Sequence, residues 1–322
     1  MFWSYVRSII MGITSRGRGA KIREVLKNEI FFNKYLNPVI RTIIKLLKIR
    51  ISDKMAYRLP AIGTFCYKLP EGKKLYFTAN GHDSIANIIY WKGLGRFEGE
   101  TIDLFLKLAK KSRIIFDIGA NTGIFALLSS IYYPEHTTYA FEPLPRVFDY
   151  LKKNMEINNL HNLKILPYAI SNYNGKIKLY VTNSPIPSNS STLKEFREFS
   201  EEIFVKAITL DNFKTEKKLS KIDLIKIDTE ATEHLVFQGS KKVLKRDRPF
   251  IICEVLKGRT EKELHKIFND YHYRYFLITT EGLREKNPIE GDGTYRFKNF
   301  LFVPSEKTNQ AISISEGHKL VL

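Results

Sequence analysis

The amino-acid sequence predicts an α/β fold with a mostly parallel, seven-stranded sheet, helices on both of its faces, and a helical N-terminal extension. Two observations predict this fold. From about residue 72 onward, short β-rich runs alternate with helical stretches, and one buried run enters a glycine turn followed by a helix. The expected strands are Arg113–Ile118, Thr137–Phe141, Leu163–Leu166, Asp223–Asp228, Phe250–Val255, Tyr273–Ile278 and Phe300–Val303. The expected helices are Ile124–Ile131, Pro145–Asn158, Glu233–Leu244 and Glu261–Asp270. A hairpin is expected from Lys176–Val181 and Phe204–Thr209, around a polar loop at Ser184–Ser191.

The predicted extension covers residues 1–71, and the predicted α/β domain covers residues 72–322. Within the extension, apolar residues recur at helical spacing: Leu36, Val39, Ile40, Ile43, Ile44 and Leu47. Arg41, Lys45 and Lys48 fall on the opposite face, and Pro38 suits the first turn of such a helix. The pattern therefore predicts an amphipathic helix, which could lie on a membrane surface or pack on the main domain.

The positive charge of the chain is concentrated near its N-terminus. The whole sequence carries a formal charge of +18, and residues 1–70 hold 14 Lys or Arg against three acids, a net of +11. Such an arm favours an anionic partner, either a membrane surface or nucleic acid, although a merely solvated surface is the alternative.

The two cysteines and the hydropathy pattern limit the class of protein. Cys66 and Cys253 are too few for a disulfide scaffold or a cysteine-rich zinc site, and we expect both to be reduced thiols in the core. The longest uncharged run of the main domain, Ile118–Pro134, is shorter than the ~20 residues of a membrane span, and Arg7 interrupts the first apolar stretch. We therefore expect a cytoplasmic protein, with peripheral membrane contact left open.

The glycine turn after the first core strand predicts a site for an adenosine-containing ligand. Asp117, Gly119, Asn121 and Gly123 follow one another at alternate positions, where the strand ends and the helix begins. A dinucleotide site needs a third glycine, which is missing here, and Asp117 would repel its two phosphates. S-adenosylmethionine fits better, because it brings an ammonium for an acid and a carboxylate for the helix start. Glu142, at the tip of the next strand, can accept hydrogen bonds from both ribose hydroxyls.

From Trp91 to Pro304 the sequence resembles the FkbM family of S-adenosylmethionine-dependent methyltransferases. The resemblance rests on these segments: Phe97-Glu98, Phe116–Gly123, Phe141-Glu142-Pro143, Tyr168–Ser171, Ile208–Asp211, Ile225–Glu230, Ile252–Val255 and Asn299–Val303. It implies a Rossmann-like class I methyltransferase fold and S-adenosylmethionine as cofactor. It also implies that Glu98 lies near the cofactor, that Ala169 lines the adenine pocket, and that Asp228 belongs to the same site. The family usually has glycine after the Asp-x-Glu pair, where this chain has Ala231-Thr232.

A methyl transfer to a hydroxyl needs a base, and the strand that ends at Asp228 offers candidates. Asp228 and Glu230 occupy alternate positions at its carboxyl end. Lys226 shares the face of Asp228 and could either keep it ionised or bind an anionic acceptor. A structural ion pair between Lys226 and Asp228 is the alternative. Glu254 and His234 are second-rank candidates for the base. No metal is expected from the histidine spacing, although an oxygen-rich divalent site of Asp228, Glu230 and Glu254 is conceivable.

The favoured function is therefore O-methylation of a sugar, a glycan or a small-molecule natural product, which the resemblance implies. A nucleic-acid methyltransferase is the first alternative, suggested by the charge; the two acids at Asp228 and Glu230 would repel phosphate. A non-catalytic, membrane-associated protein that binds an adenosine ligand is the second. A nicotinamide dehydrogenase is disfavoured by the glycine spacing.

Overall fold

The computed structural model describes residues 37–46, 51–182 and 201–316. These residues group into two compact units. The first contains the described residues up to Tyr67 together with Phe77–Phe97, and the second contains Lys68–Tyr76 and the described residues from Glu98 onward. The boundary at residue 72, between the N-terminal extension and an independently folding α/β domain, stays a prediction.

The first unit contains helices α3 (Asn37–Leu46), α4 (Asp53–Arg58) and α5 (Ser84–Lys92), and strand β1 (Ile62–Lys68), which pairs with β2 (Lys74–Asn80). Helix α3 lies within the predicted amphipathic stretch, although Leu36, Leu47 and Lys48 lie outside the described residues. Val39 is 48% exposed and Leu46 is 75% exposed, so α3 presents apolar side chains to solvent.

The expectation that both cysteines lie in the core is wrong for Cys66. Cys66 is exposed in β1, whereas Cys253 is buried. Exposure alternates along β1. Cys66 therefore shares the open face with Thr64 and Lys68, as the two-residue period of a strand requires.

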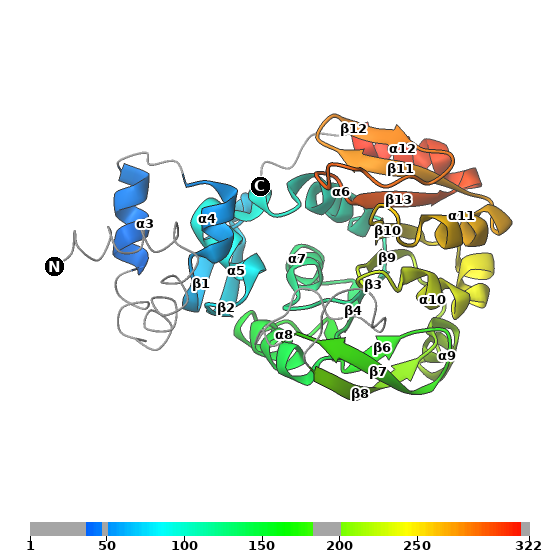
Figure 1. Ribbon diagram of the computed structural model, residues 1–322, viewed down its shortest axis with the longest axis horizontal. Helices are drawn as coiled ribbons and strands as arrows, with labels where there is room; N and C mark the ends of the chain where they lie inside the picture. The colour runs from blue at the N-terminus through cyan, green and yellow to red at the C-terminus, as the bar shows by residue number, and fades with distance from the viewer. Residues whose placement is uncertain (1–36, 47–50, 183–200, 317–322) are drawn as a thin grey trace. The chain divides into compact units, whose positions relative to one another are not determined.

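The second unit is built on an eight-stranded sheet with the order β12-β11-β13-β10-β9-β3-β4-β5 (Figure 1). Five neighbouring strands are parallel to one another: β3 (Ile114–Ile118), β4 (Thr137–Phe141), β5 (Leu163–Leu166), β9 (Leu224–Ile227) and β10 (Phe250–Glu254). Strand β13 (Asn299–Pro304) lies antiparallel between β10 and β11 (Tyr273–Thr279). All seven predicted strands are confirmed. The eighth, β12 (Gly282–Glu285), pairs with β11 at the edge and was not predicted.

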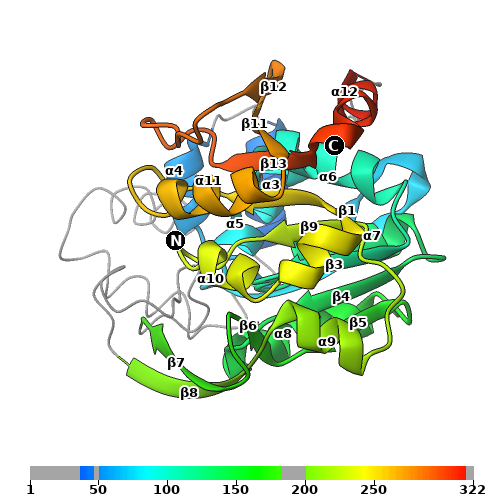
Figure 2. The same cartoon turned by 90° about the vertical axis from the view of Figure 1, so that its right-hand side faces the viewer.

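Helices cover both faces of this sheet. One face carries α9 (Leu210–Glu216), α10 (Glu233–Gln238) and α11 (Glu261–Asp270) (Figure 2). Side chains of these helices form one hydrophobic cluster with the central strands. Helices α6 (Gly99–Ala109), α7 (Ile124–Tyr132) and α12 (Thr308–Glu316) form a second group, in which α6 contacts both of the others. Helix α8 (Pro145–Ile157) contacts β5. The sheet thus follows the Rossmann-like arrangement that the sequence predicts.

The predicted helix Glu233–Leu244 is interrupted in the structure. Helix α10 ends at Gln238, and a π-helical turn follows at Val243–Asp247. A Cβ at Gly239 would collide with the backbone oxygen of Ser171, so the chain needs glycine at this close approach. The prediction of one continuous helix to Leu244 is therefore wrong, because the chain turns where Gly239 packs against Ser171.

A separate three-stranded sheet has the order β6-β8-β7. The predicted hairpin is confirmed by β7 (Gly175–Val181) and β8 (Glu201–Ile208), which pair antiparallel. Strand β6 (Tyr168–Ile170) pairs with β8 in parallel. The predicted polar loop Ser184–Ser191 lies outside the described residues.

Among the described residues, none of the helices has the length and hydrophobicity that crossing a membrane would require.

Candidate functional site

The predicted site residues gather at the carboxyl edge of the parallel strands. Strands β3, β4, β9 and β10 point in one direction, so their carboxyl ends meet at one edge of the sheet. This edge carries the glycine turn after β3 and the carboxylates that follow β4, β9 and β10.

The glycine turn allows the ends of β3 and β9 to approach each other closely. Gly119 has a φ of 76°, and a Cβ at this position would collide with the carbonyl oxygen of Asp228. Gly123 has a φ of 99°, and a Cβ there would collide with Leu151 of α8. Asn121 has a φ of 51°, a region that asparagine tolerates better than most residues. The predicted Gly-x-Asn-x-Gly spacing is therefore required by the backbone.

Asp117 lies beneath the glycine turn and is only 3% exposed. Its Oδ2 accepts a hydrogen bond of 3.0 Å from the backbone N–H of Ala126 in α7. Burial raises the pKa of Asp117 to about 7, against the opposing influence of Lys226 and of this hydrogen bond. The carboxyl thus gains or loses its proton near neutral pH.

Glu142 joins the tip of β4 to the glycine turn. One carboxylate oxygen accepts the N–H of Leu144 at 2.9 Å, and the other accepts the N–H of Asn121 at 3.0 Å. The side chain is buried, and burial raises its pKa to about 7 despite these two bonds. Glu142 therefore holds the turn in place and borders the same site.

Two further predicted residues lie on neighbouring elements. Glu98 begins helix α6 with a φ of 46°, and its Oε2 accepts a 3.0 Å hydrogen bond from Nδ2 of Asn299. Burial raises the pKa of Glu98. Ala169 is buried in β6, opposite Ala207 of β8, and packs in a cluster with Leu144 and Val147.

Lys226 is a buried cation surrounded by carboxylates. It is 1% exposed, its Nζ lies 4.0 Å from Oδ2 of Asp228, and the same atom lies 5.1 Å from the ring centroid of Phe125. Burial lowers the pKa of Lys226, but Asp228, Glu98, Glu254 and Asp117 outweigh that effect and raise it. The lysine stays charged, and the shared face predicted for Lys226 and Asp228 is confirmed.

Three carboxylates converge beside this lysine. Asp228, Glu230 and Glu254 each offer an oxygen atom, and these atoms lie within 4.8 Å of one another. Glu254 is 6% exposed; its Oε1 lies 3.5 Å from Nζ of Lys298, and its Oε2 has no hydrogen-bond partner. Burial, followed by the charges of Asp228 and Glu230, raises the pKa of Glu254 well above its ordinary value.

This spacing suits either of two tasks. Oxygen atoms that share one calcium ion can lie at most about 4.8 Å apart, which is twice a typical Ca–O distance. Carboxylates this close can also accept the proton of a hydroxyl that enters between them.

The loop after β9 explains how the acids are presented. Glu230 and Ala231 both have positive φ, 53° and 72°, so Ala231 adopts the conformation that glycine usually supplies. Glu233 is 2% exposed and its Oε1 accepts hydrogen bonds from the N–H and Oγ1 of Thr229. These bonds fix the turn. The sequence predicts Glu233 only as the start of a helix, although its position four residues after Thr229 is a signal for this contact.

Within the described residues, no hydrogen bond or ion pair links His234 to the carboxylate cluster. Its Nδ1 is buried without a hydrogen-bond partner, and burial lowers the pKa of its imidazole. The charge of Glu263 on α11 opposes this lowering of the His234 pKa. Asn299 and Lys298 were not predicted as site residues, because they belong to β13 and its preceding loop, far along the chain from Glu98 and Glu254.

Comparison with known proteins gives consistent matches. Residues 117–275 match the family described as the Methyltransferase FkbM domain. The chain is 28% identical over 229 residues to the hexuronic acid methyltransferase AglP of Haloferax volcanii, covering 71% of this chain and 90% of that protein. It is 30% identical over 160 residues to the 2-O-methyltransferase NoeI of Sinorhizobium fredii, covering 46% of this chain and 65% of that protein.

Two further matches cover a smaller share of the matched protein. The chain is 31% identical over 153 residues to the methyltransferase sdnD of Sordaria araneosa, covering 39% of this chain and 59% of that protein. Among solved structures, a methyltransferase FkbM from Methylobacillus flagellatus is 11% identical with a TM-score of 0.42, covering 68% of this chain and 53% of that chain.

Proposed function

This chain carries a domain of the FkbM methyltransferase family and is an S-adenosylmethionine-dependent methyltransferase, and from this premise we propose that it methylates a hydroxyl group of a sugar or a small natural product. The observation that carries the proposal is the trio Asp228, Glu230 and Glu254, whose oxygen atoms lie within 4.8 Å of one another beside the glycine turn. A hydroxyl needs a base when it is methylated, and such a cluster supplies one. The relatives named for hexuronic acid and 2-O-methylation support a sugar acceptor.

The chemistry of the donor set fits the cofactor. The buried carboxylates Asp117 and Glu142 suit an ammonium group and ribose hydroxyls, and the glycine turn offers bare backbone at a helix start. When bound, S-adenosylmethionine supplies an activated methyl group. We assign its binding to Glu98, Asp117, Gly119, Asn121, Gly123, Glu142, Ala169 and Asp228.

Asp228 and Glu230 are our candidates for the general base, and Lys226 is the residue that keeps Asp228 ionised. The acceptor hydroxyl would lie between the carboxylates, and one carboxylate oxygen would accept its proton. Bound S-adenosylmethionine would supply the methyl group and would leave as the neutral thioether once its carbon–sulfur bond is broken. The 4.0 Å separation between Nζ of Lys226 and Asp228 supports this division of roles. Glu254 remains the second candidate for the base.

Turnover with labelled S-adenosylmethionine tests the proposal. Wild-type protein is incubated with sugars, with a cell-envelope glycan extract and, separately, with total RNA. We expect label in the glycan or sugar, and a loss of about 10²–10⁴-fold in Asp228→Asn or Glu230→Gln with cofactor binding retained. Glu216→Gln, an exposed carboxyl on α9, is the matched control. Label that enters RNA and no sugar contradicts the proposal, and full turnover in both variants moves the base to Glu254 or His234.

We also propose that the enzyme works in the cytoplasm and makes reversible contact with an anionic membrane through residues 1–70. The net charge of +11 in this segment supports the contact, as do the exposed side chains of Val39 and Leu46 on α3.

A further inference from the structure

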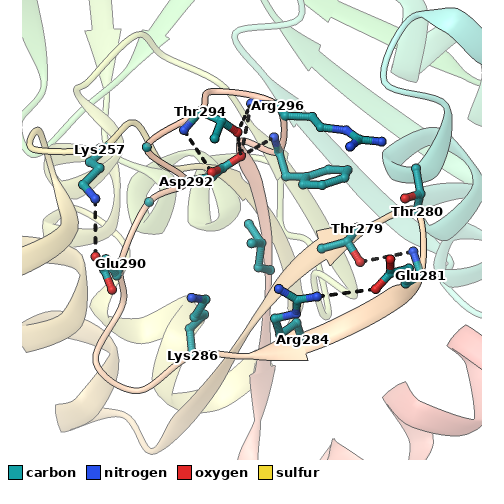
Figure 3. Close-up of a pocket in the computed structure, with 14 residues that line it drawn as sticks. Lys257, Thr279, Thr280, Glu281, Arg284, Lys286, Glu290, Asp292, Thr294 and Arg296 are labelled. Atoms are coloured by element: carbon teal, nitrogen blue, oxygen red, sulfur yellow. Dashed lines mark hydrogen bonds and ion pairs between the residues drawn. The ribbon is translucent and has the colours of Figure 1, made fainter.

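A polar pocket of about 400 Å³ lies at the same edge of the sheet as the carboxylate cluster. It is bordered by β12, by the loop after β10 and by the turn that precedes β13 (Figure 3). Strand β11 runs in the same direction as β10, because each is antiparallel to β13. Thr279, which ends β11, and Lys257, three residues after Glu254, therefore open onto the edge where the parallel strands end.

The pocket is richer in cations than in acids that can neutralise them. Four basic residues line it: Lys257, Arg284, Lys286 and Arg296. Lys257 pairs with Glu290 and Arg284 pairs with Glu281, each at 3.4 Å. Within the part of the chain that the structure describes, neither Lys286 nor Arg296 forms an ion pair.

The remaining acid of the pocket, Asp292, is committed to the backbone. Its carboxylate accepts hydrogen bonds from the N–H groups of Thr294, Arg296 and Phe297 and from the hydroxyl of Thr294 (Figure 3). These bonds, that of the Thr294 hydroxyl first, lower the pKa of Asp292 to about 2. Asp292 thus shapes the turn and is not paired with either of the two free cations.

The wall of the pocket is held in a fixed shape. A Cβ at Gly291 would come within 2.8 Å of the backbone nitrogen of Lys257, so the turn packs directly on the loop after β10. Glu261 of α11 accepts the N–H of Gly291 at 2.7 Å. The guanidinium of Arg296 lies 4.9 Å from the ring centroid of Phe297, which orients the cation beside an apolar surface.

We infer that this pocket binds an anionic oxygen group, a carboxylate or a phosphate, carried by the acceptor whose hydroxyl is methylated. Lys286 and Arg296 supply the positive charge, and packing against the Phe297 ring holds the Arg296 guanidinium in place. The volume suits a single sugar unit, since ligand pockets start at about 300 Å³. The inference rests on the proposed function in one respect: it takes the molecule that carries the anionic group to be the sugar that is methylated.

Matched acceptors test the assignment. The ratio of kcat/KM is measured for methyl glucuronide over methyl glucoside, and for glucose 6-phosphate over glucose, so the two arms distinguish carboxylate from phosphate. We expect Lys286→Gln combined with Arg296→Gln to lower the preference for at least one anionic acceptor by about tenfold or more, as the loss of charge-assisted hydrogen bonds predicts. Lys262→Gln combined with Lys266→Gln, on α11, removes the same charge outside the pocket.

Direct binding separates this inference from the proposed function. Glucuronate and glucose 6-phosphate are titrated into cofactor-loaded wild-type protein and both double variants, with thermal unfolding as the check on folding. Binding that weakens only in the pocket variant supports the pocket, even if no sugar is methylated and the proposed function fails. Methylation of neutral sugars with no anionic preference, or equal preference in both double variants, overturns the pocket while the proposed function stands.

Discussion

Replacing Asp117 with asparagine should change how the stability of the protein depends on pH. Burial raises the pKa of Asp117 from 3.8 to about 7 in the folded chain. The folded state therefore holds this proton more tightly than the unfolded state. The resulting contribution to stability is fully present below pH 3.8 and is lost as the pH rises through about 7.

The size of the effect follows from the shift. About three pKa units correspond to about 4 kcal/mol in total, of which about 3 kcal/mol falls between pH 5 and pH 8. Asparagine resembles the neutral carboxyl, and its side-chain oxygen can still accept the N–H of Ala126. We therefore expect Asp117→Asn to gain about 3 kcal/mol of stability relative to wild type over this range.

Urea unfolding at several pH values from 5 to 8, without cofactor, measures the difference. Asp149→Asn, an exposed carboxyl on α8, is the control and should follow wild type at every pH. Glu142 and Glu233 also have pKa values raised to about 7 by burial, so the variant should keep part of the slope. Parallel curves for Asp117→Asn and wild type would refute the reasoning.

Three further predictions concern the other parts of the site and the N-terminal arm. Lys226→Met should cost about 3–5 kcal/mol of stability at pH 8, because it leaves buried carboxylates without their cation. The loss should be smaller at pH 5, where these carboxylates take up protons. An equal loss at both pH values in urea unfolding contradicts this expectation. Glu142→Gln should weaken S-adenosylmethionine binding by about 1–3 kcal/mol in calorimetry, because an amide nitrogen replaces one acceptor of a backbone N–H. An unchanged Kd counts against this prediction. Full-length protein should co-sediment with anionic vesicles at low salt and be released at high salt, because each basic residue near the lipid contributes about 1 kcal/mol. Removal of residues 1–70 should abolish this binding. Failure of the full-length protein to bind rules the contact out.

Local patterns in the sequence were sufficient for much of the sheet and its glycine turn. The strand, turn and helix from Ile114 to Tyr132 follow from a buried apolar run and two glycines, and α11 has the predicted bounds, Glu261–Asp270. The parallel direction of the strands then places the acids after β4, β9 and β10 at one edge. The gathering of Asp228, Glu230 and Glu254 follows from this topology.

Features that depend on contacts between distant segments were not predictable in the same way. The end of α10 is set by the approach of Gly239 to Ser171, which no local pattern records. The bond from Asn299 to Glu98 joins residues 201 positions apart in the sequence. The exposure of Cys66 depends on which face of β1 is covered, and the sequence of the strand alone does not determine that face.

The position of β13 has a consequence for how the protein is made. β13 follows β11 and β12 along the chain, yet it lies between β10 and β11 in the sheet. Until residues 299–304 have left the ribosome and joined the sheet, the facing edges of β10 and β11 have no partner strand. A nascent chain at this stage offers two open hydrogen-bonding edges to other molecules, which is a hazard for aggregation. A chain that ends before residue 299 should therefore aggregate more readily than one that ends after residue 304.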